Sequence, residues 1–439
     1  MSKLIRCIVA VIILGSSLQC FSAGVQTDCA TLLESAKRGD LAQVLGLVSK
    51  GVNVNCRGAY GYTPLLMAAR YNRLEIAEAL IDKGADVNAD TDIDWWQEEW
   101  GFTPLVWAVN NSYVDMVSLL LGNGASVGRQ GRGRNVPLII AARKNCLPLV
   151  EMLVAKGAHV DEPDAENNGT ALIEAVAGGF LDIVDFLVKK GADLRSHDEA
   201  GASMLYIAVG RAHFAAVRYL HEKGLSVNSA DSRGWTPIFA ALDGRVESHY
   251  ILEYLIEHGA DVSVRSADGT TPLMVASHSG DTKTLDILIA KGADVRAKNK
   301  FGQTALQSAC RGIGYYQDED STKREAMISL LLNNGAEVNT QDRDGNTPLI
   351  EASSRGGSRI VGILLAHGAL PNVQDRLGWT ALMHAADVNQ TEVIRALVQN
   401  GADMNLRDSK GQSALGIAKK KEASAQAYGL LKSLGAKDE

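Results

Sequence analysis

The chain has 439 residues and a formal net charge of −7 that is spread along its length rather than gathered in a tail. Mild acidity argues against general nucleic-acid binding, which needs a basic face that displaces counterions. After the N-terminal segment, no apolar run reaches the roughly 20 residues that a membrane-spanning helix needs, so no stable membrane insertion is expected.

The first 24 residues differ from the rest. A short basic region precedes the apolar run CIVAVIILG, which is followed by small residues. This order is typical of a secretory signal peptide, here with cleavage after Ser22 or Gly24. Two alternatives stay open, a lipoprotein signal acylated at Cys20 and a retained anchor, for which the apolar run is short. Removal of residues 1–24 predicts a periplasmic or secreted protein.

The remaining chain repeats one motif, which is clearest in DGTTPLMVASHSGDTKTLDILIAKGADV, residues 268–295. Its Asp-Gly pair predicts a turn, since glycine tolerates a positive φ. Thr271 then caps a helix that opens with proline, whose missing N–H has no partner at that position. Gly280 breaks this helix, and a second one runs to Gly292. Because so short a helical pair cannot bury its apolar face alone, copies must stack on both sides.

The period is close to 33 residues, and twelve openings of the T-P-L type are matched by twelve closing glycines. The opening Thr position falls at Thr31, Thr63, Thr103, Val136, Thr170, Ser203, Thr236, Thr271, Thr304, Thr347, Thr380 and Ser413. With T-P-L-x-x-A and a terminal G-A-D-V-N, the pattern resembles the ankyrin repeat of exported bacterial-type proteins. The resemblance implies an all-α fold, an α-solenoid with short β-hairpin fingers in which each repeat contacts only its neighbours.

The repeats predict one solenoid over residues 25–439. An N-terminal capping repeat, at about 29–59, lacks the T-P-L proline and is charged. Internal repeats fill about 60–408, and a C-terminal capping repeat covers about 409–436. The lysine run from Lys419 in the last repeat is interpreted as a solvated face, with an anionic partner as the alternative.

One position departs from the family. The residue after T-P-L is usually His in ankyrin repeats, but this chain has Leu66, Val106, Ile139, Ile173, Tyr206, Phe239, Met274, Gln307, Ile350 and Met383. We therefore expect apolar packing to replace the hydrogen bonds of that His, and other groups to satisfy the turn.

Four cysteines remain after signal removal. Cys29 and Cys56 belong to the first repeat and its exit loop, so in an oxidising compartment a disulfide between them would staple the terminal repeat. The alternative is two unpaired thiols, because sequence spacing alone does not fix the geometry. Cys146 and Cys310 are expected to pack as apolar residues.

The finger before Thr103 is lengthened by an insertion that carries Trp95, Trp96 and Trp100 among acidic residues. Exposed tryptophan is enriched at binding hot spots, so this finger is a candidate contact site. The alternative is that the rings fold back over neighbouring fingers.

The next finger carries Arg129, Arg132 and Arg134. These arginines either neutralise the acidic finger beside them or bind a carboxylate or phosphate of a partner, with help from Arg143 and Lys144. Mutual neutralisation is the preferred interpretation.

A second insertion, RGIGYYQDEDSTKR from Arg311, separates the two helices of the ninth repeat. Tyr315 and Tyr316, followed by acidic residues, form either a second contact patch or a tolerated surface loop.

The sequence contains no H-E-x-x-H, P-loop, G-x-S-x-G or paired C-x-x-C motif, and its histidines are scattered singly. We therefore predict no catalytic residues, no metal site and no cofactor. The family resemblance implies a monomeric, non-enzymatic protein that binds another protein through its fingers and the concave face of its inner helices. A secreted effector that binds a host protein and an enzyme with a cryptic groove site are the alternatives.

Overall fold

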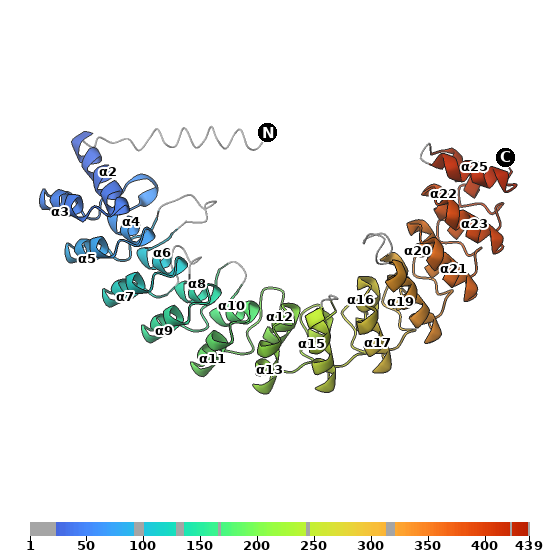
Figure 1. Cartoon of the computed structure of the whole chain (residues 1–439), viewed down its shortest axis with the longest axis horizontal. Helices are drawn as coiled ribbons and strands as arrows, with labels where there is room; N and C mark the ends of the chain where they lie inside the picture. Colours follow the sequence, from blue (N-terminus) through green and yellow to red (C-terminus); the bar gives the residue numbers. More distant parts are fainter. Residues whose placement is uncertain are drawn as a thin grey trace. The chain divides into compact units, whose positions relative to one another are not determined.

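The computed structural model describes residues 23–91, 101–128, 136–165, 168–242, 246–312, 321–421 and 424–437. The chain divides into two compact units, Met1–Glu199 and Ala200–Glu439, called unit 1 and unit 2. Each consists of successive helix pairs (Figure 1). The predicted signal peptide falls almost wholly outside the described residues, and it stays a prediction, as does the continuity of a single solenoid.

Unit 1 contains helices α2 to α11 and one 3-10 turn. Their bounds are α2 (Ala23–Arg38), α3 (Leu41–Ser49), η1 (Ala59–Gly61), α4 (Pro64–Arg70), α5 (Leu74–Asp82), α6 (Pro104–Asn110), α7 (Val114–Gly122), α8 (Pro137–Arg143), α9 (Leu147–Ala155), α10 (Ala171–Gly178) and α11 (Leu181–Lys189). The first helix of each repeat, called the inner helix, packs on the inner helix of the next repeat, from α2 through α4, α6 and α8 to α10. The second, outer helices from α3 to α11 form a parallel row.

Unit 2 repeats this arrangement. Its helices are α12 (Met204–Gly210), α13 (Phe214–Glu222), α14 (Pro237–Ala240), α15 (Val246–Glu257), α16 (Pro272–Ser279), α17 (Thr282–Ala290), α18 (Ala305–Arg311), α19 (Ser321–Asn333), α20 (Pro348–Arg355), α21 (Ser358–Ala366), α22 (Ala381–Asp387), α23 (Thr391–Gln399), α24 (Ala414–Lys419) and α25 (Ala425–Ser433). The inner helices are again the even-numbered ones.

The inner helices begin where the T-P-L motif predicts. In most repeats the side chain of the opening residue accepts a hydrogen bond from the N–H three residues later, which satisfies one of the orphan donors of the first turn. The Thr63 hydroxyl accepts from Leu66 N at 3.2 Å, and the Thr271 hydroxyl accepts from Met274 N at 3.4 Å. Gly292, with a φ of +91°, follows the outer helix α17, as predicted.

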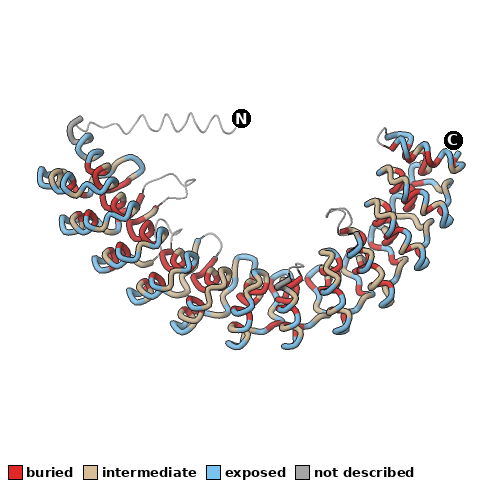
Figure 2. The backbone as a smooth tube through the Cα atoms, viewed as in Figure 1, coloured by how far each residue is buried: buried red, intermediate tan, exposed pale blue. Residues whose placement is uncertain are grey.

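The core lies between the helices. Figure 2 shows the buried segments within the helices of both units. Eight of the ten residues that follow T-P-L are buried apolar side chains, for example Leu66, Val106 and Met274, and Tyr206 is partly exposed. Gln307 is the polar exception, and it is buried. It forms a capping box with Thr304 and donates from Nε2 to the carbonyl of Asn346 at 2.7 Å, so other groups do satisfy the turn at this position.

An asparagine of the G-A-D-V-N type links neighbouring repeats on the outer side of both units. In unit 1, Asn55 Nδ2 donates to the carbonyl of the next closing glycine, Gly84, at 3.0 Å, and its Oδ1 accepts from Asp86 N at 2.7 Å. In unit 2, Asn372 bonds in the same way to Gly401 and Asp403, at 3.1 and 2.8 Å. We call this two-bond link the asparagine bridge. Equivalent bridges start at Asn88, Asn228 and Asn339.

The first repeat differs from its prediction. Thr31 does not open a helix but lies inside α2, where its hydroxyl donates to the Thr27 carbonyl at 2.7 Å. Without a proline or a preceding glycine turn, nothing stops the helix from starting earlier, so α2 begins at Ala23. Cleavage after Gly24 would remove its first two residues.

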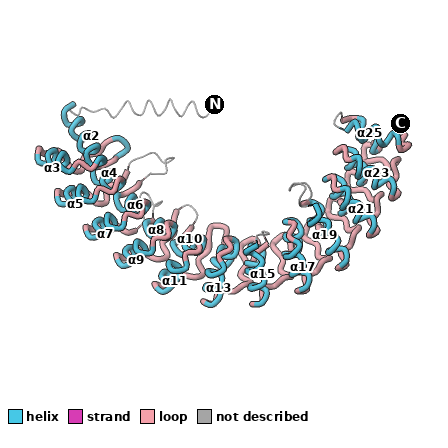
Figure 3. The backbone as a smooth tube through the Cα atoms, in the orientation of Figure 1, coloured by secondary structure: helices cyan, strands magenta, loops and turns pink. Residues whose placement is uncertain are grey.

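The fingers also differ in detail from the predicted β-hairpins. Within the described ranges no residue lies in a strand, and the fingers consist of tight turns (Figure 3). Five-residue turns such as Asp375–Trp379 close on a single backbone pair, which is too short for two paired strands. The helical part of the fold prediction is confirmed.

Candidate functional site

The predicted contact residues lie outside the described part of the chain. Residues 92–100 include the three tryptophans Trp95, Trp96 and Trp100, residues 129–135 include the three arginines Arg129, Arg132 and Arg134, and residues 313–320 include Tyr315 and Tyr316. The structure does describe the segments from which these loops leave, and the candidate site is built from them.

The long finger of unit 1 is closed at its base by two hydrogen bonds. Thr91 N donates to the Phe102 carbonyl at 3.0 Å, and Phe102 N donates to Thr91 Oγ1 at 2.9 Å. The two residues are 11 apart in sequence, whereas the closing pairs of unit 2, such as Asp375 and Trp379, are 4 apart. The finger is therefore seven residues longer than those of unit 2, and it leaves and re-enters the stack at one fixed point.

An arginine held among aromatic rings lies at this base. The Phe102 ring meets Trp107 of α6 edge-on, with centroids 5.0 Å apart. The Arg70 guanidinium, at the end of α4, lies 4.3 Å from the Trp107 ring centroid and 5.5 and 5.8 Å from those of Tyr62 and Tyr71. Arg70 also hydrogen-bonds the Tyr62 hydroxyl. Contacts of this kind are worth about 0.5–2 kcal/mol each, so they form an ordered floor beneath the long finger.

The arginine at this position has counterparts in other repeats. Arg70, Arg143 and Arg311 each lie seven residues after the opening position of an inner helix. Each contacts the residue four after the opening position of the next inner helix, respectively Trp107, Glu174 and Glu351. Three pairs of inner helices are thus joined by the same arginine position, with a tryptophan as the partner in one pair and a glutamate in the other two.

In unit 1 the second of these contacts is an exposed ion pair. Arg143 Nη2 lies 2.8 Å from Glu174 Oε1, and this hydrogen bond raises the pKa of Arg143. The sequence interpretation had Arg143 assist the finger arginines in binding a partner. Because Glu174 engages Nη2, a partner would have to bind the remaining N–H donors of Arg143 or compete with Glu174.

In unit 2 the corresponding arginine, Arg311, contacts a second carboxylate in addition to the glutamate, and the ion pairs are more buried. Arg311 Nε donates to Glu351 Oε1 at 2.7 Å, and its Nη2 donates to Asp342 Oδ2 at 2.8 Å. Burial would lower the pKa of Arg311, but the two carboxylates outweigh it and the pKa is raised. Asp342 also closes its own finger by accepting from Asp344 N and Asn346 N, both at 2.9 Å. One arginine therefore joins α18, the following finger and α20.

The fingers of unit 2 are linked to one another by backbone atoms. The carbonyl of each finger-tip residue accepts from an N–H of the next finger, at distances of 2.7 to 3.0 Å. These bonds, called the finger ladder, run from Ala267 N to Arg233 O, Lys300 N to Asp268 O, Arg343 N to Phe301 O, Arg376 N to Asp344 O and Ser409 N to Leu377 O. The tip side chains remain exposed, including Phe301 at 47% and Leu377 at 61%.

Buried carboxylates close two of these fingers. Burial alone would raise the pKa of Asp231, but N–H donors of Trp235 and Arg233 and the Arg233 guanidinium lower it overall. Burial acts in the same direction on Asp408, and N–H donors from its own finger again lower the pKa overall. Both side chains therefore act as ionised acceptors at neutral pH.

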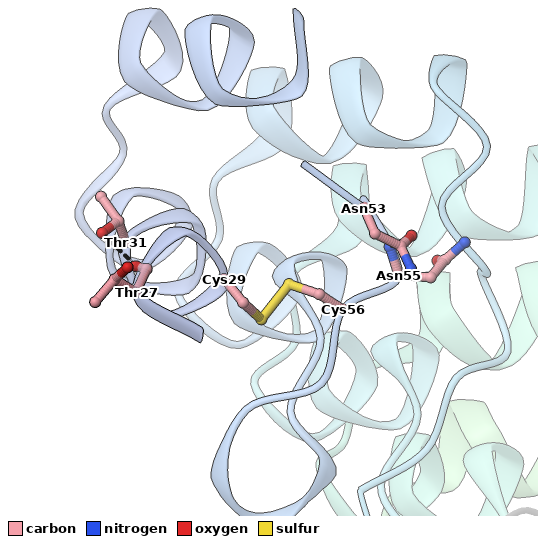
Figure 4. Close-up of a disulfide and its surroundings, with 6 residues drawn as sticks. All are labelled: Thr27, Cys29, Thr31, Asn53, Asn55 and Cys56. Carbon is pink, nitrogen blue, oxygen red and sulfur yellow. Dashed lines mark hydrogen bonds between the residues drawn. A yellow bond between two sulfur atoms is a disulfide. The ribbon is translucent and has the colours of Figure 1, made fainter. Parts of the chain in front are cut away.

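A disulfide joins Cys29 of α2 to Cys56, with 6.0 Å between the two Cα atoms (Figure 4). It connects α2 to the segment that leads into the first finger, next to the asparagine bridge of Asn55. Cys146 and Cys310 are free thiols, and Cys310 is buried. Burial raises the pKa of the Cys310 thiol far above its usual range, which keeps it protonated and unreactive.

Sequence reasoning missed three features. The recurring arginine and the bridging asparagine each had a signal, because both stand at fixed positions of the period. The finger ladder had none, because backbone atoms make it and any residue except proline supplies them. Among the described residues there is no group of three or more His, Cys, Asp and Glu side chains arranged around a metal position. The helices described are all too short or too polar to cross a bilayer.

Comparison with known families settles the architecture. The family model for ankyrin repeats, in three copies, matches residues 32–131, 128–198, 172–266, 247–318 and 320–424. The chain belongs to the ankyrin-repeat family. Ankyrin repeats indicate a scaffold for protein–protein interaction.

The similar proteins match this chain over only part of their own length. Ankyrin repeat and SOCS box protein 16 of Homo sapiens is 32% identical over 184 residues, 42% of this chain and 39% of that protein. L-asparaginase of Dirofilaria immitis is 27% identical over 181 residues, 41% of this chain and 29% of that protein. Ankyrin repeat and KH domain-containing protein mask-1 of Caenorhabditis elegans is 29% identical over 256 residues, 57% of this chain and 8% of that protein. The chain thus matches well under two thirds of each relative.

Proposed function

We propose that the protein is an exported, non-enzymatic scaffold that binds a protein partner through its fingers and inner helices. The long finger with Trp95, Trp96 and Trp100 is the main contact. The observation that carries this proposal is the base of that finger. Two hydrogen bonds between Thr91 and Phe102 fix where the finger begins and ends, and the ordered rings beneath it restrain the base.

A fixed base favours binding because it lowers the entropy that a loop loses when a partner orders it. Tryptophan supplies a large contact area with only two side-chain torsions. Arg129, Arg132 and Arg134 on the next finger add positive charge beside the acidic long finger. These arginines either neutralise that finger or steer an acidic partner toward it, and the salt dependence of binding distinguishes the two.

Export rests on the N-terminal sequence. N-terminal sequencing of the protein from its own cell is expected to find a start near residue 23 to 25, outside the cytoplasm. An intact Met1 on cytosolic protein would exclude export, and a lipidated Cys20 would replace release by anchoring.

The binding experiment has two steps. A pull-down from the native cell envelope, identified by mass spectrometry, supplies the partner, and calorimetry then measures its affinity for each variant. Replacing one anchoring tryptophan by alanine is expected to weaken binding by about 2 kcal/mol or more, with little change in melting temperature. Arg129→Ala and Arg132→Ala are expected to weaken binding mainly at low salt.

Tyr250→Ala is the matched control, because this aromatic side chain is 66% exposed but lies on the outer helix α15. If all three tryptophan variants bind as tightly as the wild type, the contact site would instead be assigned to the inner helices or to Tyr315 and Tyr316. A large fall in melting temperature would instead assign the rings a structural role.

Two alternative functions have their own tests. A secreted effector is expected to appear in the medium or in host cells, and its captured partner would be a host protein. An enzyme with a cryptic site would turn over at least one member of a broad substrate panel. The second alternative has less support, since the sequence contains no H-E-x-x-H, P-loop or G-x-S-x-G motif.

A further inference from the structure

Two histidines meet on the outer helices of unit 2, outside the finger face. His221 lies in the last turn of α13, and His258 follows the last residue of α15. Their ring centroids are 4.9 Å apart, and the ring planes are inclined by 79°. His258 is exposed and His221 is partly exposed, so both rings are accessible from solvent.

A single residue, Tyr254, orients both imidazoles. Its carbonyl accepts from His258 Nδ1 at 2.7 Å, and its hydroxyl is hydrogen-bonded to His221 Nδ1 at 2.9 Å. The Tyr254 ring also packs against both imidazoles, with centroids 4.0 Å from His258 and 5.7 Å from His221. The two rings are therefore held by bonds and by stacking.

These hydrogen bonds determine which nitrogens are available. Because a carbonyl can only accept, His258 Nδ1 carries the proton, and the neutral ring keeps its lone pair on Nε2. The His221 ring has the same arrangement when its Nδ1 donates to the Tyr254 hydroxyl. Neither Nε2 atom has a hydrogen-bond partner among the residues described. This is the state of a metal-binding histidine, which donates its other N–H to a carbonyl or a similar acceptor.

The electrostatic surroundings also favour a cation. Both histidines lie at helix C-termini, where the helix dipole is negative. Glu222 follows His221, and Glu257 precedes His258. The nearby cations are already engaged, Arg218 with Glu222 at 3.5 Å and Lys223 over the Tyr219 ring at 5.2 Å.

We propose that His221 and His258 form a surface site for one late first-row divalent cation, held by the two Nε2 atoms and water. Imidazole suits copper, nickel and zinc, and the intrinsic order of affinity puts Cu²⁺ first. Since no third metal-binding side chain joins them among the described residues, water fills the remaining positions and the site is open. This proposal is independent of partner binding by the fingers.

The chain contains a matched control. His367 follows the outer helix α21 as His258 follows α15, it is exposed, and its Nδ1 donates to the Ile363 carbonyl at 2.9 Å. It differs in having no second imidazole beside it among the described residues. A comparison of His258 with His367 therefore isolates the contribution of the pair.

The test is calorimetric titration of the purified full chain with CuCl2 and with NiCl2 in a non-coordinating buffer. The metal affinity of one site is expected to fall at least roughly tenfold in His258→Ala and in His221→Ala. It is expected to be unchanged in His367→Ala. Tyr254→Phe keeps the carbonyl bond but loses the hydroxyl bond, and loss of such a supporting bond typically costs about 10-fold or more in metal affinity. Circular dichroism checks that each variant is folded.

Copper bound elsewhere on the chain is common to all variants and cancels from the comparison. Electron paramagnetic resonance at one equivalent of Cu²⁺ gives a second readout, with coupling to two imidazole nitrogens expected in the wild type and to one in His258→Ala. Equal affinity of His258→Ala and the wild type would overturn the proposal. So would an equal loss in His367→Ala, because a single surface histidine would then explain the binding.

Discussion

Neighbouring repeats within unit 1 and within unit 2 share one kind of link, whereas the fingers of the two units differ. Asparagine bridges link neighbouring repeats in both, for example from Asn55 in unit 1 and from Asn372 in unit 2. The finger ladder, in contrast, occurs in unit 2, and the described residues of unit 1 contain no backbone bond between fingers.

The two units also differ in finger length. A tip carbonyl can meet an N–H of the next finger only when successive fingers have the same reach. In unit 2 the closing pairs have a constant spacing, as in Asp231 with Trp235 and Asp408 with Gln412. In unit 1 they vary, from Gly58 with Tyr62 to Thr91 with Phe102. The fingers of unit 1 thus differ in length from one another, and this unit carries the proposed contact finger.

The largest effect is expected from the disulfide, which restrains the end of unit 1. Replacing Cys29 and Cys56 by serine removes a link across 27 residues and should destabilise the first repeat by about 3 kcal/mol. Hydrogen exchange should show faster opening of α2 and α3 and little change elsewhere. Cys146→Ser is the control, and reduction of the wild type should reproduce the double variant. If protein purified from its own compartment has free thiols at Cys29 and Cys56, the disulfide does not form there and the predicted restraint of the first repeat is wrong.

The next largest effect is the loss of stability when the recurring arginine is replaced, and it is expected to differ between the two units. Arg311→Met leaves Asp342 and Glu351 without their partner, and these side chains are only 1% and 11% exposed. The expected loss is about 2–3 kcal/mol, because buried carboxylates become unpaired. Arg143→Met breaks a pair whose arginine is 54% exposed and should cost less than about 1 kcal/mol. Urea unfolding of both variants measures the difference, and equal losses would contradict it.

A smaller effect is expected from adding a methyl group to the finger ladder. At Gly378, with φ at +78°, a Cβ would lie 2.8 Å from Ser409 N, the donor to Leu377 O. Gly378→Ala should therefore cost about 2 kcal/mol, from left-handed strain and one lost hydrogen bond. Gly401→Ala, with φ at +87° and open space around it, should show the strain alone, about 1 kcal/mol. Thermal unfolding compares the two, and an equal loss would show that the ladder adds no stability.

The smallest effect is a pH dependence at the fingers of unit 2. The pKa values of Asp231 and Asp408 are lowered in the folded chain. Their contribution is therefore complete above the unfolded pKa of about 4 and is lost as the pH falls through the lower folded pKa. Hydrogen exchange between pH 5 and pH 3 should show these fingers losing protection before the carboxylate-free turn closed by Gly58 and Tyr62. In Asp408→Asn the dependence should disappear at its finger, and an unchanged pH profile would contradict the assignment.

The sequence predicted most of the stack because its signals are local. A threonine before a proline caps a helix whatever surrounds it, and a glycine with positive φ ends one. The prediction failed at Thr31, where neither proline nor a glycine turn sets the start of the helix. It stayed incomplete at Gln307, whose partner is the carbonyl of Asn346 in the next repeat, a contact that no local rule reveals.

The candidate site was less predictable. Composition drew attention to the long finger, but a loop of this length has many accessible conformations, so the orientation of Trp95 does not follow from sequence. The pairing of His221 with His258 was also hidden, since the two lie in different repeats and meet only through the packing of α13 and α15 around Tyr254. Scattered histidines in a repeat protein become neighbours when their positions in successive repeats nearly coincide.

Because main-chain atoms alone form the finger ladder, the ladder itself does not constrain which side chains stand at its tips. Arg233, Asp268, Phe301, Asp344 and Leu377 occupy equivalent places and have unrelated chemistry. At the donor positions only proline is excluded, since it lacks the N–H. Evolution or a combinatorial library can therefore change this row of residues one repeat at a time and alter what it recognises without rebuilding the scaffold.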